Sequence, residues 1–89
     1  MTFDNLVFIK HPNNFFEGLM AKYKFDNGKE LSVVAGNNLY CTTRYGNRKG
    51  GPMLEVEDVS SWEVLVEGSE VQGWQTKEDI NKLIKENTQ

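Results

Sequence analysis

Residue types that carry enzyme chemistry are scarce in this chain. Its 89 residues include one cysteine, one histidine and two prolines. A single cysteine, Cys41, excludes an internal disulfide, and a reducing cytoplasmic setting is the default expectation. His11 has no cysteine or second histidine at ligand spacing, so no metal centre can be assembled around it from the sequence. We therefore expect no metal and no cofactor, and we interpret Cys41 as a small buried apolar residue.

Long apolar runs are also missing. No stretch approaches the roughly 20 apolar residues that span a bilayer, and the N-terminus lacks the basic and apolar regions of a secretory signal. A chain of this length forms one domain, residues 1–89, which buries roughly 60–65% of its unfolded surface. It has no room for a deep cleft between two domains. We therefore expect neither membrane insertion nor enzyme activity.

The charge balance argues against a general nucleic-acid binder, because such proteins carry a marked basic excess. The formal net charge is −3. Residues 1–50 hold seven Lys or Arg against four Asp or Glu, whereas residues 51–89 hold three against nine. The two halves are either complementary parts of one fold, or the second half presents an acidic face to a partner.

Residues 19–35 predict a β-hairpin. A two-residue loop would set Phe25 opposite Glu30 and mix apolar with charged side chains on both faces. A three-residue loop, with Gly28 in the left-handed conformation, keeps one face apolar. The resulting cross-strand pairs are Phe25 with Lys29, Lys24 with Glu30, Tyr23 with Leu31, Lys22 with Ser32 and Ala21 with Val33.

Short apolar or alternating runs predict the rest of the sheet. The expected strands are 2–11, which ends before Pro12, 39–45 beside the hairpin, 53–58, 61–67, and a short one at 71–74. A turn at 59–61 would join two of them and pair Val56 with Val64 and Leu54 with Val66.

One helix is expected near the C-terminus. Thr76 can cap its first turn, and the acidic residues that follow suit the positive end of the helix dipole. Ile80, Leu83 and Ile84 form an i, i+3, i+4 stripe that needs a sheet face to cover it. Trp74 should anchor this packing as a buried side chain. The fold class is therefore α+β, with an antiparallel sheet of about five strands and a C-terminal helix on one face.

The expected strands gather glutamates on one side. Glu57 would lie directly opposite Glu63, with Glu55 and Glu67 flanking them. Like charges that face each other destabilise a sheet, so the arrangement needs a reason. Either the two lysines on the outer side of the hairpin, Lys22 and Lys24, neutralise it, or the face is kept acidic for a basic partner. Sequence order does not fix strand order, and both explanations stay open.

A basic, glycine-rich segment, residues 46–52, suggests an alternative. It lacks the strand–Gly-x-x-x-x-Gly-Lys-Ser/Thr–helix context of a phosphate-binding loop. Basic and aromatic side chains in and before it can still form a weak nucleic-acid patch. That patch would consist of Tyr40, Arg44, Tyr45, Arg48 and Lys49.

Two passages carry a resemblance. One is Phe25-Asp26-Asn27-Gly28 followed by Ser32-Val33-Val34, and the other is Val71-Gln72-Gly73-Trp74-Gln75-Thr76-Lys77-Glu78-Asp79-Ile80. Together they resemble a loose group of small proteins encoded by bacteriophages, in which such a hairpin and helix start bracket a pair of short strands. The resemblance implies a viral origin, and small phage proteins often act by binding a host protein. No catalytic residue comes with it.

These observations favour a non-enzymatic binding protein. We expect a phage-encoded inhibitor or modulator of a host defence or nucleic-acid-processing protein, acting in the host cytoplasm through Glu55, Glu57, Glu63 and Glu67. The alternative is a small nucleic-acid-binding module that uses the basic patch.

Overall fold

The β2–β3 hairpin lies at the centre of the sheet. In the computed structural model, which describes residues 1–46 and 53–88, β2 (Leu19–Lys24) and β3 (Glu30–Ala35) pair in the predicted antiparallel register. The backbone N–H of Phe25 donates to the carbonyl of Lys29 at 2.9 Å. Gly28 has φ +87°. The three-residue loop and the left-handed glycine are therefore confirmed.

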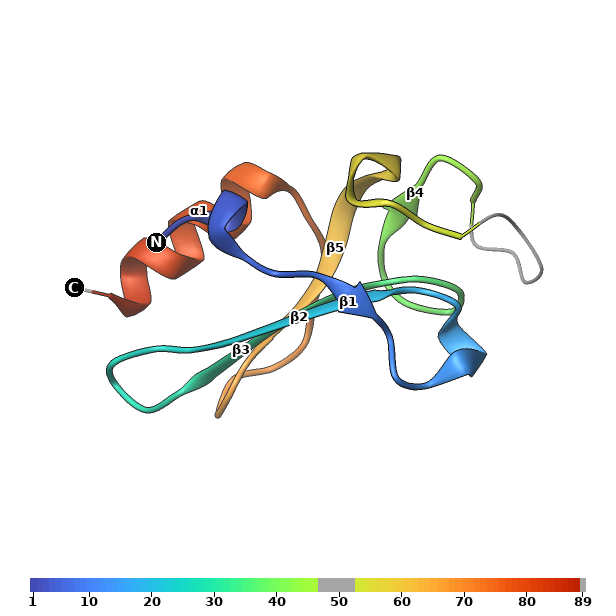
Figure 1. The fold of residues 1–89 in the computed structure, drawn as a ribbon. Helices are drawn as coiled ribbons and strands as arrows, with labels where there is room; N and C mark the ends of the chain where they lie inside the picture. Colours follow the sequence, from blue (N-terminus) through green and yellow to red (C-terminus); the bar gives the residue numbers. More distant parts are fainter. Residues whose placement is uncertain (47–52, 89) are drawn as a thin grey trace.

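The other strands extend this hairpin on both sides (Figure 1). The sheet order is β1-β2-β3-β5-β4, and β6 also pairs with β5. All pairings are antiparallel. The bounds are β1 (Ile9–Lys10), β4 (Thr42–Thr43), β5 (Val59–Val66) and β6 (Gln72–Gln75). With the helix α1 (Lys77–Asn87) contacting the sheet, the predicted α+β fold is confirmed.

The core lies between the inner face of the sheet and α1. Its largest fully buried side chains come from β3, β5 and the helix: Leu31, Val33, Trp62, Val64, Ile80 and Ile84. The ring of Trp62 stacks on Phe8 with centroids 4.5 Å apart. Thr76 caps α1 as predicted, since its hydroxyl accepts from the N–H of Asp79 at 3.2 Å. Within the described ranges, no helix has the length and apolar composition needed to cross a membrane.

The N-terminal segment differs from the predicted strand. A 3₁₀ turn, η1 (Phe3–Asn5), comes first, and the two residues of β1 that follow at Ile9–Lys10 are exposed. The side chain of Asn5 accepts from the N–H of Thr2 at 2.9 Å, which stabilises the turn. The N–H of Phe3 donates to the side chain of Asn81 at 2.7 Å. These bonds fix a turn against α1, and only two residues remain to pair with β2.

The predicted strand 39–45 does not lie beside the hairpin. The second neighbour of β3 is β5, with Val33 opposite Val64. Because β4 pairs with the other edge of β5, the connection between β3 and β4 passes over β5. Leu39 is buried there, and only the two residues of β4 form a ladder. The prediction failed because a third strand next to the hairpin was inferred from sequence order.

The predicted strand 53–58 and the turn at 59–61 are also wrong. The chain forms a 3₁₀ turn, η3 (Val56–Asp58), and then continues directly into β5. The buried carboxylate of Asp58 accepts from the N–H of Glu55 at 3.0 Å, which closes the turn. Consequently Val56 does not pair with Val64, and the opposition of Glu57 to Glu63 does not exist.

Candidate binding surface

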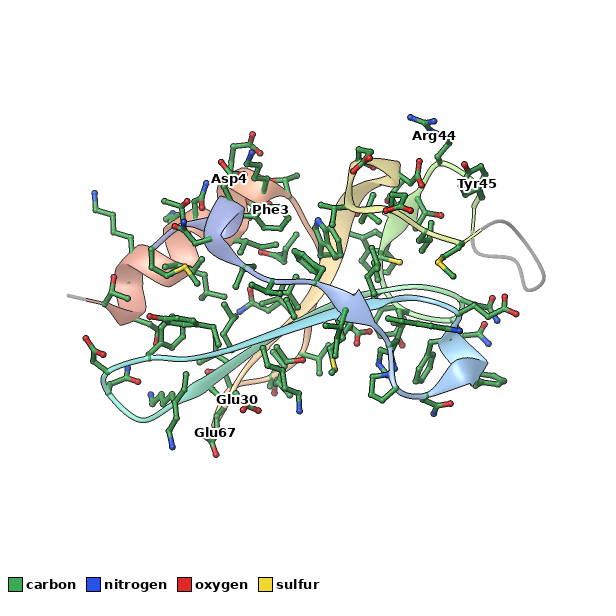
Figure 2. All side chains as sticks on the ribbon, in the orientation of Figure 1. Phe3, Asp4, Glu30, Arg44, Tyr45 and Glu67 are labelled. Atoms are coloured by element: carbon green, nitrogen blue, oxygen red, sulfur yellow. The ribbon has the colours of Figure 1, made fainter. Side chains whose placement is uncertain are left out.

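The structure separates the four glutamates of the predicted acidic face. Glu63 lies opposite Val34 in the sheet. Glu67 accepts from the N–H of Glu30 at 3.2 Å, and Figure 2 shows these two side chains together below the hairpin. Glu57 borders a hollow on the helix side of the sheet, beside Trp62. No single face therefore unites the four carboxylates.

The lysines expected to neutralise that face do not reach it. The ammonium of Lys22 lies 3.7 Å from the carboxylate of Glu30, its cross-strand diagonal neighbour. The structure gives no ion pair between Lys24 and any described residue. The explanation that these lysines neutralise an acidic face therefore fails, because the predicted pairing of Glu57 with Glu63 does not exist.

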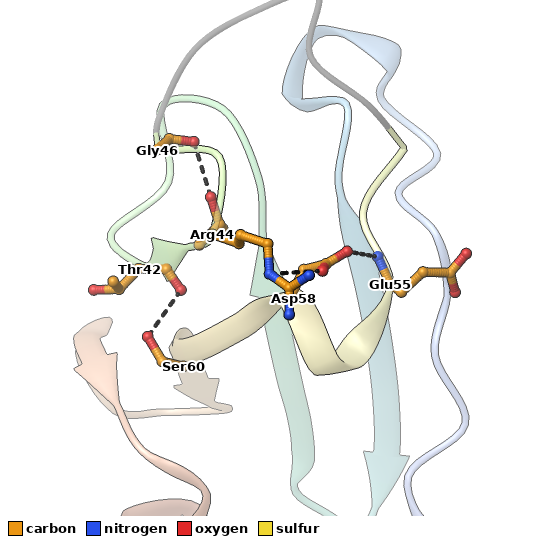
Figure 3. A network of polar contacts seen from close by, with 7 residues as sticks. Thr42, Arg44, Gly46, Glu55, Asp58 and Ser60 are labelled. Carbon is orange, nitrogen blue, oxygen red and sulfur yellow. Dashed lines mark hydrogen bonds and ion pairs between the residues drawn. The ribbon is translucent and has the colours of Figure 1, made fainter.

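The predicted basic patch is only partly assembled. The guanidinium Nε of Arg44 lies 3.5 Å from a carboxylate oxygen of Asp58 (Figure 3), so its charge is already partnered inside the fold. Figure 2 shows Arg44 and Tyr45 together at the end of the molecule away from Glu67. Arg48 and Lys49 lie outside the described residues. The ring of Tyr40 is exposed, but its neighbour is not part of the basic patch.

That neighbour is Trp74. The two rings lie with centroids 5.2 Å apart and planes inclined by 40°, and the residues are 57% and 59% exposed. The prediction that Trp74 is a buried anchor is therefore wrong. Trp62, at 1% exposed, occupies the core position beneath the helix. Trp74 instead presents a large aromatic surface to solvent.

The backbone holds Trp74 in this position. Trp62 pairs with Gln75 and Val64 pairs with Gln72, so the two residues Gly73 and Trp74 form a bulge opposite Glu63. Bulges re-aim side chains in this way. Trp74 has φ +53°, a conformation that costs a bulky L-residue of order 1–2 kcal/mol. Such strain persists only where the surrounding structure imposes it, and it concentrates at functional sites.

Tyr40 is fixed just as closely. Its carbonyl accepts from the N–H of Trp74 at 2.9 Å. Its side chain packs over Gly73, where an added Cβ would lie 2.7 Å from the Cβ of Tyr40. The glycine therefore makes room for the tyrosine. The bulge, the hydrogen bond and the close packing together specify one arrangement of the two rings.

Glu63 completes this arrangement. Its carboxylate accepts from the N–H of Tyr40 at 3.2 Å. It makes no ion pair with any cation of the described ranges. One titratable neighbour is His11, whose pKa is lowered from 6.5 mainly by burial; Glu63 opposes this shift and Lys22 adds to it. The lowered pKa favours the neutral imidazole at neutral pH, so His11 is a poor counter-ion for Glu63.

A shallow hollow of about 240 Å³ adjoins this carboxylate on the sheet face opposite α1. Glu63 and apolar side chains line it, among them the exposed Leu65 and Val71 and the buried Val34 and Leu39. His11, Phe16 and Ser32 complete its wall. We define the outer-face patch as the half-buried Glu63 with four exposed residues: Leu65 and Val71, which line the hollow, and the adjacent Tyr40 and Trp74.

The surroundings of Cys41 disfavour a nucleophilic role. Cys41 is half-buried, and its Sγ lies 3.4 Å from the carbonyl of Gly36, to which it donates. Burial, reinforced by the charge of Glu63, raises the pKa of the thiol against the opposing backbone hydrogen bond from Gly36. A raised pKa disfavours the nucleophilic thiolate. Among the described residues, no group of three or more His, Cys, Asp or Glu side chains could hold a metal ion.

A signal for the exposed tryptophan was present in the sequence. An isolated glycine inside a strand pattern indicates a bulge, and Gly73 precedes Trp74 in this way. No pattern could place Tyr40 beside it, because that contact depends on the connection over β5. No protein family, curated protein or solved structure matches this chain. The resemblance to phage proteins therefore stays a prediction, and the function must be argued from the patch itself.

Proposed function

We propose that this protein is a non-enzymatic binding domain that contacts a partner protein through the outer-face patch. The observation that carries the proposal is the exposed Tyr40–Trp74 pair, held by a strained backbone at Trp74. Tyrosine and tryptophan are enriched among the residues that dominate binding energy at protein interfaces. Because the two rings are already ordered, a partner would not have to immobilise them on binding.

The patch replaces the acidic face as the proposed contact. Of the four predicted glutamates, it retains only Glu63. The apolar side chains of Leu65 and Val71 lie around it, and an exposed apolar surface with a charged member is typical of recognition sites. The resemblance to small phage proteins extends the proposal: the partner would be a host protein in the cytoplasm, which the domain inhibits or modulates.

A nucleic-acid-binding module is the alternative function. The two adjacent, exposed rings favour it, because bases stack on exposed aromatic side chains. Two charges oppose it. Glu63 lies against Tyr40 and would repel phosphates, and Arg44 is already paired with Asp58. The protein-binding function accounts for the carboxylate and is therefore preferred.

Site-specific photo-crosslinking tests the proposal. A photoreactive amino acid would replace Val71, which belongs to the patch, and in a control protein Val7, which is 77% exposed on the N-terminal segment. Both proteins would be irradiated in bacterial lysate, with and without prior nuclease treatment. We expect specific adducts from position 71 that excess unlabelled wild-type protein suppresses.

The competitor variants decide the result. Excess Tyr40→Ala/Trp74→Ala protein should suppress the adducts at least tenfold less well than the wild type, since hot-spot truncations cost about 2 kcal/mol or more. Equal competition by the wild type and the double variant would show that the patch does not contribute to binding. Loss of the adducts on nuclease treatment would favour the nucleic-acid function instead.

A further inference from the structure

We propose that Tyr40, Glu63 and Trp74 bind a cationic side chain, an arginine or a lysine, of the partner protein. This inference rests on the proposed function, because it names the chemistry that the outer-face patch recognises. Three features of the patch converge on a cation: two exposed aromatic side chains, a carboxylate with no counter-ion among the described residues, and an apolar floor.

The rings supply the first attraction. The face of an aromatic ring carries partial negative charge, and a guanidinium or ammonium within about 6 Å of its centroid is attracted by about 0.5–1 kcal/mol at an exposed site. Tyr40 and Trp74 lie 5.2 Å apart by their centroids, so one cation can lie close to both rings. The chain already uses this contact elsewhere, since the ammonium of Lys77 lies 5.8 Å from the centroid of Phe3.

Glu63 supplies the charge. Its carboxylate reaches the backbone of Tyr40 and is therefore fixed beside the rings. The cations that the structure does pair are committed to other carboxylates: Lys22 to Glu30, Arg44 to Asp58 and Lys77 to Asp4. A half-buried carboxylate left with one hydrogen bond gains from a cationic ligand, because charge-assisted hydrogen bonds are roughly twice as strong as neutral ones.

The hollow suits the rest of such a side chain. Lysine and arginine carry aliphatic stems that pack on apolar surface while their charged ends stay polar. Leu65 and Val71 border the hollow that Glu63 also lines, so the stem can lie on them while its charged end reaches the carboxylate. A phosphate or a carboxylate would find no positive group in this set. A neutral apolar side chain would leave Glu63 unpaired.

The two tryptophans allow a direct measurement. The indole N–H of Trp74 should report on the patch, and that of Trp62, 1% exposed in the core, serves as an internal reference. We would titrate ¹⁵N-labelled protein with N-acetyl-arginine amide and separately with N-acetyl-citrulline amide, which has a similar shape but no charge. The arginine compound should shift the Trp74 signal saturably, with an affinity at least fivefold higher than the citrulline compound. The Trp62 signal should stay in place.

Variants assign the effect to the named groups. Glu63→Gln keeps the shape of the side chain and should weaken binding of the arginine compound about three- to tenfold, the range expected for a partly buried ion pair. Glu67→Gln is the matched control, a glutamate just beyond the end of β5, and should leave the affinity unchanged. Gly73→Ala retains both rings but forces Tyr40 to move, and should weaken binding as well.

The outcomes separate this inference from the proposed function. Equal shifts by arginine and citrulline, or an unchanged affinity in Glu63→Gln, would overturn cation recognition. A shift of Trp74 by an oligothymidine and none by arginine would overturn it in favour of nucleic acid. In each of these cases, photo-crosslinking at position 71 still tests the protein-binding function independently. If the double variant also competes as well as the wild type in the crosslinking experiment, both cation recognition and protein binding through the patch are overturned.

Discussion

The backbone and side chains of Tyr40 and Trp74 meet on the protein surface: the N–H of Trp74 donates to the carbonyl of Tyr40 at 2.9 Å, and their rings lie 5.2 Å apart. This contact joins the connection over β5 to the short strand that precedes α1. It orders two large aromatic side chains that burial does not fix. A contact that orders side chains before binding lowers the entropy lost when a partner binds.

Substitution of Trp74 separates backbone strain from side-chain packing. At φ +53° glycine is favoured over any L-residue, by about 1–2 kcal/mol. We therefore expect Trp74→Gly to be more stable than Trp74→Ala by about 1 kcal/mol, although glycine is normally the poorer residue in a strand. Urea unfolding of the two variants, followed by circular dichroism, measures the difference.

Binding should not distinguish the two variants. Both variants lack the indole, so both should lose binding at the outer-face patch equally, whatever their stability. Trp74→Gly with a stability close to that of the wild type and no binding would identify position 74 as a recognition residue. If Trp74→Ala is the more stable of the two, the left-handed conformation at Trp74 is not imposed by the fold.

Trp62 should behave differently from Trp74. It is 1% exposed and stacks on Phe8 at 4.5 Å and against Phe3 at 5.6 Å. Truncation of a buried tryptophan to alanine costs about 3–5 kcal/mol. We expect Trp62→Ala to lose this much, enough to unfold much of the population of a domain with marginal stability. Thermal melting of Trp62→Ala beside Trp74→Ala makes the comparison, and similar melting temperatures would contradict the assignment of the two residues to core and surface.

The parts of the fold that local chemistry determines were predicted from the sequence. The hairpin register followed from keeping Tyr23 and Leu31 on one apolar face, and the helix start followed from the capping by Thr76. The order of the strands was not predictable in this way. Nothing local distinguishes a strand that returns beside the hairpin from a connection that passes over β5. The acidic run was misassigned because the capping of Glu55 by Asp58 competed with strand alternation.

The candidate site depended on this missing information. Its members come from β5, β6, the residue just before β6 and the connection before β4, and only their arrangement in space brings them together. Glu63 was named from the sequence for a different reason, namely its supposed opposition to Glu57. Tyr40 was named as part of a basic patch. The assignment of Trp74 to the core followed from expecting the tryptophan nearest to the helix to cover it, whereas Trp62 lies on the inner face of β5.

Gly28 tests the turn of the central hairpin. It has φ +87°, and no atom lies within 4 Å of the position of an added Cβ. A larger side chain would therefore meet no steric obstacle from other residues, and its whole cost would come from the backbone conformation. Gly28→Val should lose about 1–2 kcal/mol of stability. Gly28→Asn should lose less, because asparagine tolerates the left-handed region. Equal stability of Val and Gly at this position, measured by urea unfolding, would contradict the three-residue loop.

His11 should make the stability depend on pH just below neutrality. Burial lowers the pKa of its imidazole below the ordinary 6.5, and its Nδ1 accepts from the N–H of Asn13 at 3.0 Å, a bond that the imidazolium cannot accept. The unfolded chain therefore binds the proton more readily than the folded one, and stability falls as the pH drops through 6.5 and below. Of the charges that act on it, Glu63 opposes the shift and Lys22 reinforces it.

The two other groups with shifted pKa values act in different pH ranges. The lowered pKa of Asp79 matters below its ordinary 3.8, and the raised pKa of Cys41 matters above its ordinary 9.0. Between pH 7.5 and 5.5 the response should therefore come from His11. Urea unfolding of the wild type should show a steady loss of stability over this range, and His11→Gln should flatten it. A slope that is the same in both proteins would mean that the imidazole stays as readily protonated in the fold as in the unfolded chain.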